Sequence, residues 1–295
     1  MTSRSEFKGW IIKGKKPLPD AKFRIKAFCS AAKKLNMSLE YKLECEALTE
    51  ISDIFEGNMA PPDFYVYSDT GINGLLEAKG VRGFNSVQAI DICRDKLKSY
   101  CALSKFNIPQ PKTFMVPSNY SEMSSKQIDD FYNESAEILG VPFVGKVRCG
   151  SMGEGIRLIS NKQEFEDFMM MLDYQKTKGI ISEFISEAFG EDFRFQVIGN
   201  EVVNAYGRRS NDPGEFRANV HLGGSRVEYH PTQDEIELAV KAARICGCDF
   251  AGVDIIHSDK GPVIIELNTL PQFPGTTFAE QIMGYVNDCM RKERN

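Results

Sequence analysis

The sequence lacks long hydrophobic runs, a clustered set of histidines and cysteines, and an excess of positive charge. Its apolar runs are only a few residues long, too short for a membrane-spanning helix. Cys246 and Cys248 lack the C-x-x-C spacing of zinc sites, and His221, His230 and His257 are scattered. The net charge of -5 leaves no surplus of lysine and arginine to neutralise phosphates. We therefore expect no membrane, no structural zinc and no nucleic acid among its partners.

The first ten residues, MTSRSEFKGW, also lack the apolar stretch of a secretory signal. Eight cysteines without a paired pattern suit small core residues in a reducing compartment, so we expect a cytoplasmic protein. The hydrophobic content of 42% and charged content of 26% are ordinary for a soluble globular chain. A chain of 295 residues can form two or three packed units.

Residues 1–94 alternate between short apolar strands and helices. The pattern indicates strands at 9–13 and 63–68, with a short helix after the second strand that ends at Gly80. Between the strands, apolar residues at a spacing of four predict an amphipathic helix over 20–36: Phe23, Ala27, Ala31 and Leu35. Strands that alternate with helices predict a doubly wound parallel sheet.

The pattern changes at residue 95. Residues 95–178 predict a helix, a strand after a proline-containing turn, a polar interruption at 118–130, and two strands around a glycine-rich loop. Residues 179–295 predict an antiparallel pair that turns at Gly199, a hairpin that turns near Gly261, and two helices. We expect a small central α+β domain followed by a C-terminal domain with an antiparallel sheet.

Polar side chains end the apolar strand at 263–268. Glu266 and Asn268 stand two residues apart, so strand alternation places both on one face, and the expected hairpin turns Asp254 toward them. Three hard oxygen donors suit magnesium, which keeps its other positions for water and phosphate. A salt bridge together with a turn-capping asparagine is the alternative explanation for Glu266 and Asn268.

A glycine-rich loop, GSMGEG at 150–155, follows Lys146. It matches neither the G-x-x-x-x-G-K-[ST] phosphate loop nor the dinucleotide fingerprint, because a strand rather than a helix follows. Such a loop can close over phosphates through its backbone N–H groups, or it can simply form a tight hairpin turn. Lys146 lies on a strand that we expect to be buried, where its charge needs an anion as partner. Lys96, Arg208 and Arg217 would add positive charge to such an anion site. Each of these cations alone also fits a solvated surface charge.

Taken in order, these segments resemble the ATP-grasp superfamily, and within it the RimK-type amino-acid ligases. The resemblance covers roughly residues 81–292 and rests on FNSVQAIDICRDKLKSY, PQPKT, VPFVGKVRCGSMGEGIRLI, SEFISEAFGEDFRFQVIGNEVV, GRRSNDPGEFRANVHLGG, AGVDII and IIELNTLP. FRANVHLGG is similar to the RimK branch, in which Phe-Arg-x-Asn precedes a paired glycine. The resemblance implies the ATP-grasp fold, with an N-terminal doubly wound parallel-sheet domain (1–94), a small central α+β domain (95–178) and a C-terminal antiparallel-sheet domain (179–295).

The resemblance also implies a role for each matching residue, with ATP and two magnesium ions as cofactors and manganese as an alternative metal. The residues it assigns to ATP are Lys96 and Lys146 at the adenine side and the α/β-phosphates, Gly150, Ser151, Gly153 and Gly155 in a mobile phosphate lid, Glu183, Phe184 and Ile185 at the adenine edge, and Asp192 at the ribose. The residues it assigns to the metal ions are Asp254, Glu266 and Asn268, with Glu266 bridging. The catalytic residues it implies are Arg217 and Asn219 beside the γ-phosphate and the acyl-phosphate, and Arg208 as a clamp for a substrate carboxylate.

The implied activity is that of an ATP-dependent carboxylate–amine ligase. ATP would convert a carboxylate to an acyl-phosphate and an amine would then attack it, with no covalent protein nucleophile. The donor would be an amino acid such as glutamate, and the acceptor an amine on a small molecule or at a peptide or protein end. The resemblance further suggests a homo-oligomer.

The sequence departs from the RimK-type pattern after Asn268. The loop TLPQFPGTT, residues 269–277, replaces a shorter Pro-Gly loop near the expected acceptor site, and NTLP is similar to the D-alanine–D-alanine ligases. Gln272 and Phe273 either redirect the acceptor pocket or are ordinary loop variation. A D-alanine–D-alanine-like dipeptide ligase and a non-catalytic ATP-binding regulatory module are therefore the alternatives.

Overall fold

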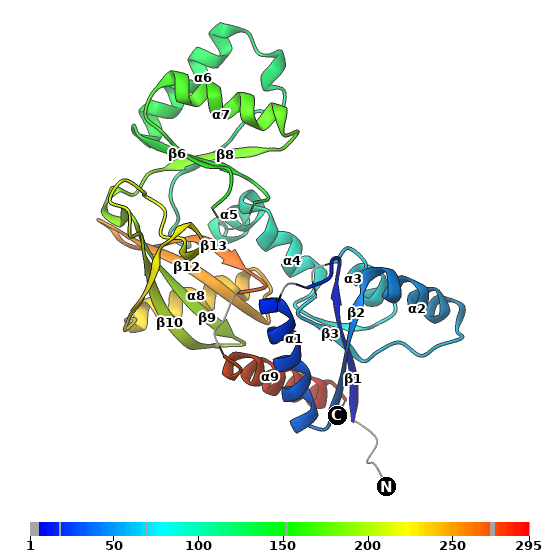
Figure 1. Cartoon of the computed structure of the whole chain (residues 1–295). Coiled ribbons are helices and arrows are strands. Elements are labelled where there is room, and N and C mark those ends of the chain that lie inside the picture. Colours follow the sequence, from blue (N-terminus) through cyan, green and yellow to red (C-terminus); the bar gives the residue numbers. More distant parts are fainter. Residues whose placement is uncertain (1–5, 18, 69, 151–152, 272–274, 295) are drawn as a thin grey trace.

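The computed structural model describes residues 6–17, 19–68, 70–150, 153–271 and 275–294. Three sheets organise the chain, and Figure 1 shows the central sheet as a lobe at one end, with the N-terminal and C-terminal sheets beside each other in the rest of the molecule. This mixed α/β architecture with one parallel and two antiparallel sheets confirms the fold expected from the sequence.

The N-terminal sheet is parallel and has the order β2-β1-β3-β4. Its strands are β1 (Phe7–Lys13), β2 (Met37–Leu43), β3 (Phe64–Val66) and β4 (Arg82–Phe84). Helices α1 (Pro19–Lys34) and α9 (Thr277–Arg294) cover one face, and α2 (Glu44–Glu56) and α3 (Asn73–Glu77) cover the other. The doubly wound arrangement is confirmed, whereas β2 and α2 are additions that the sequence analysis does not anticipate.

Helix α1 buries most of the predicted row: Ala27 and Ala31 lie in the core and Leu35 packs against it. Phe23 is 51% exposed, while Ile25, Phe28 and Ala32 lie in the core. The helix contacts the parallel sheet and also packs against α9, which comes from the opposite end of the chain. The buried stripe of α1 therefore contains the predicted row without Phe23 and is wider than that row.

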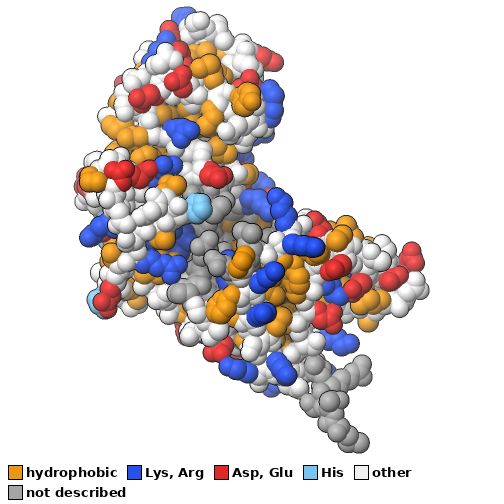
Figure 2. All heavy atoms as spheres, in the orientation of Figure 1, with side chains coloured by type: hydrophobic (Ala, Val, Ile, Leu, Met, Phe, Trp, Pro, Cys, Tyr) orange, Lys and Arg blue, Asp and Glu red, His pale blue; other side chains and the backbone are white. Residues whose placement is uncertain are grey.

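The central sheet has the antiparallel order β5-β8-β6-β7. Its strands are β5 (Thr113–Met115), β6 (Phe143–Val147), β7 (Ile156–Ile159) and β8 (Gly179–Glu183), with α6 (Ser125–Leu139) and α7 (Lys162–Tyr174) packed around a phenylalanine-rich core. The polar stretch at 118–130 is not an interruption, because it holds a 3-10 turn (Tyr120–Glu122) and the start of α6. In Figure 2 this lobe projects from the molecule above a notch, and Lys and Arg side chains gather below the notch.

Strand β8 corrects the expected division of the chain after residue 178. It pairs with β5 and β6, so residues 179–183 belong to the central sheet rather than to the C-terminal one. Helices on both sides of the expected division after residue 94 pack on the C-terminal sheet. Helix α4 (Val87–Arg94) contributes Cys93 to the core of that sheet, and α5 (Lys96–Ser104) contributes Leu103. The domain limits otherwise stay predictions.

The C-terminal sheet is antiparallel in the order β11-β10-β9-β12-β13. Its strands are β9 (Glu191–Ile198), β10 (Glu201–Arg209), β11 (Ser225–Glu228), β12 (Phe250–Ser258) and β13 (Gly261–Asn268), and α8 (Gln233–Ile245) packs against it. Both predicted hairpins are present, with turns at 199–200 and 259–260.

The two faces of this sheet differ sharply in polarity. Phe195, Val253 and Ile264 are fully buried on the face toward α8, where each contributes about 1.5–3 kcal/mol of hydrophobic stabilisation. The other face carries a row of directly paired residues that crosses the sheet from β11 to β13: Glu228, Tyr206, Arg194, Asp254 and Glu266. Because paired residues on antiparallel strands point to the same side, this row gives the sheet one charged face.

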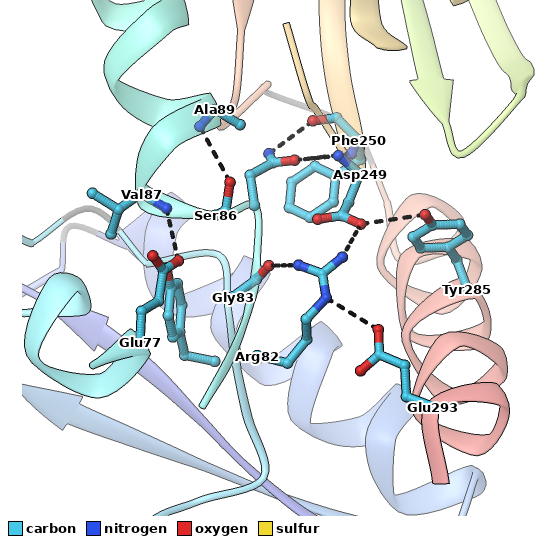
Figure 3. Close-up of polar contacts among 12 residues, drawn as sticks. Glu77, Arg82, Gly83, Ser86, Val87, Ala89, Asp249, Phe250, Tyr285 and Glu293 are labelled. Carbon is cyan, nitrogen blue, oxygen red and sulfur yellow. Dashed lines mark hydrogen bonds and ion pairs between the residues drawn. The ribbon is translucent and has the colours of Figure 1, made fainter. Parts of the chain in front are cut away.

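A polar junction fixes the C-terminal sheet to the N-terminal domain (Figure 3). The Asn85 side chain accepts hydrogen bonds from the backbone N–H groups of Asp249 (2.6 Å) and Phe250 (3.1 Å), and it donates to the carbonyls of Phe250 (2.8 Å) and Thr269 (3.2 Å). Arg82 donates to Asp249 at 2.7 Å. Asn85 thus holds the start of β12 together with the segment that follows β13.

No helix within the described ranges is long and apolar enough to cross a membrane.

Candidate active site

The candidate site is a cleft between the central sheet and the charged face of the C-terminal sheet. It contains about 890 Å³ of space, part of it open to solvent. The cleft brings together these residues singled out from the sequence: Lys96, Lys146, Gly150, Gly153, Glu183, Phe184, Ile185, Asp192, Arg208, Arg217, Asn219, Asp254 and Glu266. Gly155 and Asn268 do not line it, and Ser151 lies outside the described residues.

The walls of the cleft include apolar side chains that the sequence analysis does not single out. Val144 and Ile156 come from the central sheet, and Ile256 and Ile265 come from the C-terminal sheet. Two of these could have been found by alternation, since Val144 lies two residues from Lys146 and Ile256 two residues from Asp254. Apolar walls with a few polar groups are typical of a pocket for a flat organic ring.

Two lysines lie in the cleft beside the glycine-rich loop. The Nζ atom of Lys96 donates to the Gly150 carbonyl at 3.0 Å and lies 3.2 Å from a Glu266 carboxylate oxygen. The Nζ atom of Lys146 donates to the Tyr100 hydroxyl at 3.4 Å. Lys96 begins α5, where the Asp95 side chain caps the helix by accepting from the Leu97 N–H at 3.0 Å. The ammonium of Lys96 is thus held near both the loop and a metal candidate.

The glycines of the loop serve different purposes. Gly155 has a φ of 67°, and a Cβ there would stand 2.3 Å from the Val147 Cγ2, so this glycine is required by the β6–β7 turn. Gly153 has a φ of 80° and lies against Asn219, whose Oδ1 would be 3.1 Å from an added Cβ. The hairpin explanation therefore holds for Gly155, while Gly150 and Gly153 border the cleft.

Arg217 links the loop to the C-terminal domain. Its guanidinium donates to both carboxylate oxygens of Glu215, at 2.8 and 2.6 Å, and to the carbonyl of Gly153 at 2.9 Å. The hydrogen bond from Arg217 lowers the pKa of the Glu215 carboxyl below its usual range, so this pair is ionised at neutral pH. Glu215 is a site residue that the sequence analysis missed.

Four charged side chains form a buried network under the cleft. Arg194 donates to both Asp254 oxygens at 2.6 Å. Arg208 donates to both Asp192 oxygens, at 2.5 and 2.8 Å, and lies 2.9 Å from the Asp254 carboxylate. The Arg208 guanidinium bonds to two aspartates and also lines the cleft together with Asp192, so the clamp role of Arg208 and the ribose role of Asp192 stay predictions.

Burial and charge act in opposite directions on these two aspartates. Burial raises the pKa of Asp192 to about 6, although the charge of Arg208 opposes the rise. Burial also acts to raise the pKa of Asp254, but the charges of Arg194 and Arg208 outweigh it and hold that pKa below its usual range. Asp254 is therefore the firmly ionised member of the network.

The metal candidates converge on one face of the expected hairpin, where a β-bulge between Asp254 and Ile255 shifts the register by one residue. Asp254 is directly paired with Glu266, and the Asn268 side chain donates to Asp254 at 3.5 Å. Within the described residues no group of three His, Cys, Asp or Glu side chains could hold a metal ion. Two carboxylates and one carboxamide fit magnesium, whose other ligands are usually water and phosphate.

A second cleft adjoins the first on the same face of the sheet. It contains about 850 Å³ of space, part of it open to solvent, and Glu266, Arg208 and Asn219 line both clefts. Its other lining residues are Arg194, Tyr206, Val220, His221, Arg226, Asn268 and Leu270. The arrangement places the metal candidates where the two clefts meet. Gln272 and Phe273, expected near the acceptor, lie outside the described residues.

Two proteins named as ligases resemble this chain in sequence. A protein of Hahella chejuensis, named probable alpha-L-glutamate ligase 2, is 36% identical over 221 residues, which span 74% of this chain and 69% of that protein. The probable alpha-L-glutamate ligase of Thioalkalivibrio sulfidiphilus is 36% identical over 231 residues, spanning 76% of this chain and 73% of its own.

Solved structures share the fold over almost the whole chain. The D-alanine–D-alanine ligase of Bacillus anthracis complexed with ATP superposes with a TM-score of 0.69 at 18% identity, covering 98% of this chain and all of that one. A RimK domain protein of Sphaerobacter thermophilus gives a TM-score of 0.68 at 14% identity, covering 95% and 98%. At such identities the likeness shows the ATP-grasp fold alone.

The family is shown by the sequence match. A family model described as a RimK-like ATP-grasp domain matches residues 93–285, which include every site residue named above. Together with the relatives, this match identifies an ATP-dependent ligase that forms C–N bonds. The chain belongs to the RimK-like ATP-grasp family.

Proposed function

We propose that the protein uses ATP to activate the carboxylate of an amino acid as an acyl-phosphate and then joins it to an amine. The observation that carries the proposal is the meeting of two clefts at Glu266, Arg208 and Asn219, beside the metal candidates. One cleft can hold the nucleotide while the other holds the carboxylate to be activated. Glutamate is the proposed donor, supported by relatives named as probable alpha-L-glutamate ligases.

In this proposal the first cleft binds ATP. The adenine lies between the apolar walls, with the backbone at 183–185 at its edge, and the phosphates extend toward Lys96, Lys146 and the glycine-rich loop. The two ammonium groups would neutralise phosphate charge in a partly enclosed site, where electrostatic interactions are stronger than in water. Lys96 would then exchange its contact with Glu266 for a phosphate oxygen.

Magnesium would be held by Asp254, Glu266 and Asn268. We propose two magnesium ions, which manganese can replace. When bound, the metal would neutralise the charge on the transferring phosphoryl group. Arg194 and Arg208 would fix the carboxylate of Asp254, and Arg208, which lines both clefts, would also be placed to clamp a substrate carboxylate.

The reaction itself follows from the position of the second cleft. A carboxylate oxygen of the donor attacks the γ-phosphorus, the bond to ADP breaks, and an acyl-phosphate forms. An amine nitrogen then attacks the acyl carbon, phosphate leaves, and the amine gives up a proton to solvent. Arg217 and Asn219 would stabilise the negative charge of both transition states, and Arg217 couples this role to the loop through its bond to Gly153.

A turnover assay tests the proposal. ADP release and amide formation are measured with MgATP over a panel of amino acids paired with amines, for the wild type, Glu266→Gln and the exposed matched control Glu137→Gln. We expect turnover that requires one acid and one amine, that is lost in Glu266→Gln and kept in Glu137→Gln. Equal turnover in both variants would refute the assigned role of Glu266, and ATP binding without product over the whole panel would favour a regulatory ATP-binding module.

We further propose that the protein works in the cytoplasm and forms a homo-oligomer. The first is supported by the need for ATP and by cysteines that the structure describes as free thiols. The second is supported by the family resemblance, and light scattering of the purified chain would test it through the measured mass.

A further inference from the structure

Arg226 is a cation of the second cleft to which the family resemblance assigns no role. It lies on β11, at the edge of the C-terminal sheet, and lines this cleft together with Glu266 and Asn268. Its guanidinium carbon stands 4.6 Å from the centre of the Tyr206 ring, a cation–π stacking arrangement. Tyr206 is itself buried at 9% exposure, so the ring is a fixed platform that limits the orientations of the guanidinium.

The charges around this cleft single out Arg226. The other two arginines of its lining are engaged by carboxylates: Arg194 bonds to Asp254, and Arg208 bonds to Asp192 and Asp254. Arg226 is exposed and makes no ion pair within the part of the chain that the structure describes. Its guanidinium therefore retains hydrogen-bond donors that a planar carboxylate can accept in a bidentate manner.

The sheet register relates Arg226 to the metal candidates. Arg226 is paired with Arg208, which in turn is paired with Asp192, so all three side chains lie on the charged face. Strands β11 and β12 are separated by β10 and β9, which at about 4.8 Å per step places them about 14 Å apart. A molecule that reaches from the metal candidates toward Arg226 must be elongated, and an anionic group at its far end would pair with the guanidinium.

We propose that Arg226, stacked on Tyr206, binds a second carboxylate of an amino-acid substrate, one that takes no part in amide formation. This inference rests on the proposed ligase function and adds a specificity residue to it. The arginine makes the second cleft selective for a dicarboxylic amino acid over its neutral amide. The second carboxylate can belong to the donor or to the acceptor, and the two sources are distinguished by which Michaelis constant changes.

The test compares Arg226→Gln and Arg226→Lys with the wild type, using glutamate and glutamine in each substrate position. We expect Arg226→Gln to raise KM for glutamate roughly 10- to 100-fold, the loss expected for a hydrogen bond to a charged group, while KM for ATP is unchanged. The variant should treat glutamate and glutamine alike. Arg226→Lys should recover part of the affinity, because it keeps the charge but not the fork.

Arg157→Gln is the matched control, since Arg157 is also an exposed strand arginine, belongs to the central sheet and lines neither cleft. It should leave every Michaelis constant unchanged. A rise in KM for the donor alone, or for the acceptor alone, in Arg226→Gln supports the inference and identifies the substrate that Arg226 binds. Unchanged constants for both substrates in Arg226→Gln, in an enzyme that turns over, overturn the inference and leave the proposed function intact.

A binding experiment tests the role of Arg226 if the proposed ligase function fails. If the wild type makes no amide with any pair, glutarate binding is measured by titration calorimetry with magnesium and a non-hydrolysable ATP analogue. Weaker glutarate binding by Arg226→Gln than by Arg157→Gln then supports the anion site by itself. Equal binding by the two variants, or no binding by the wild type, overturns it.

Discussion

Neighbouring arginines on β10 provide a direct test of the buried network. Arg208 has a side chain that is 7% exposed and bonds to Asp192 and Asp254, whereas the side chain of Arg209 is 62% exposed and pairs with Glu191. We expect Arg208→Met to lower the free energy of unfolding by about 3–5 kcal/mol, because it leaves a buried carboxylate without its partner. Arg209→Met should cost about 0–1 kcal/mol, the usual value of an exposed ion pair.

The assay is chemical denaturation of each variant without ligands, followed by circular dichroism. A second substitution checks the cause: Asp192→Asn in the Arg208→Met background removes the unpaired charge and should restore part of the lost stability. Asp254 keeps its two bonds from Arg194 in all of these variants, which limits the loss to the Asp192 side of the network. Equal destabilisation by Arg208→Met and Arg209→Met, or no recovery in the double variant, would refute the electrostatic reasoning.

Three further predictions concern ATP binding and the domain junction. Lys96→Met should weaken binding of a non-hydrolysable ATP analogue roughly 10- to 100-fold by calorimetry, while the exposed control Lys126→Met leaves it unchanged. Gly153→Ala should raise KM for ATP, since its Cβ would press on Asn219, and should lower the free energy of unfolding by about 1–2 kcal/mol because of its positive φ; an unaltered KM would contradict this. Asn85→Ala should lower the free energy of unfolding by on the order of 3 kcal/mol, because four backbone groups lose their partner, and a loss under about 1 kcal/mol would show that water replaces it.

The parts of the site that could be predicted from the sequence depend on local structure. The turn at Gly261 brings Asp254 opposite the end of the next strand, and a β-bulge between Asp254 and Ile255 then makes Glu266, rather than Ile265, its direct partner. The strand–loop–strand pattern around 150–155 is local in the same sense. The sequence does not decide whether this loop covers phosphates or only forms a tight hairpin turn. The structure separates the two explanations, because Gly155 lies against Val147 and Gly153 lies against Asn219.

The features that were missed depend on contacts between distant segments. Arg194 meets Asp254 because β9 pairs with β12, a pairing across about sixty residues that no spacing in the sequence reveals. Strand β8 was assigned to the wrong sheet because its partners, β5 and β6, precede it and α7 intervenes. The bonds of Arg208 to Asp192 and Asp254 were missed for the same reason, because they become visible only in the folded sheet.

The central claim is that glutamate is activated as an acyl-phosphate, and hydroxylamine trapping measures this step without knowledge of the acceptor. The protein is incubated with MgATP, glutamate and hydroxylamine, and the hydroxamate and the nucleotide products are quantified. The account predicts glutamyl hydroxamate and ADP in equal amounts, both absent without glutamate and both lost in Glu266→Gln. ADP without hydroxamate, or AMP in place of ADP, would contradict it.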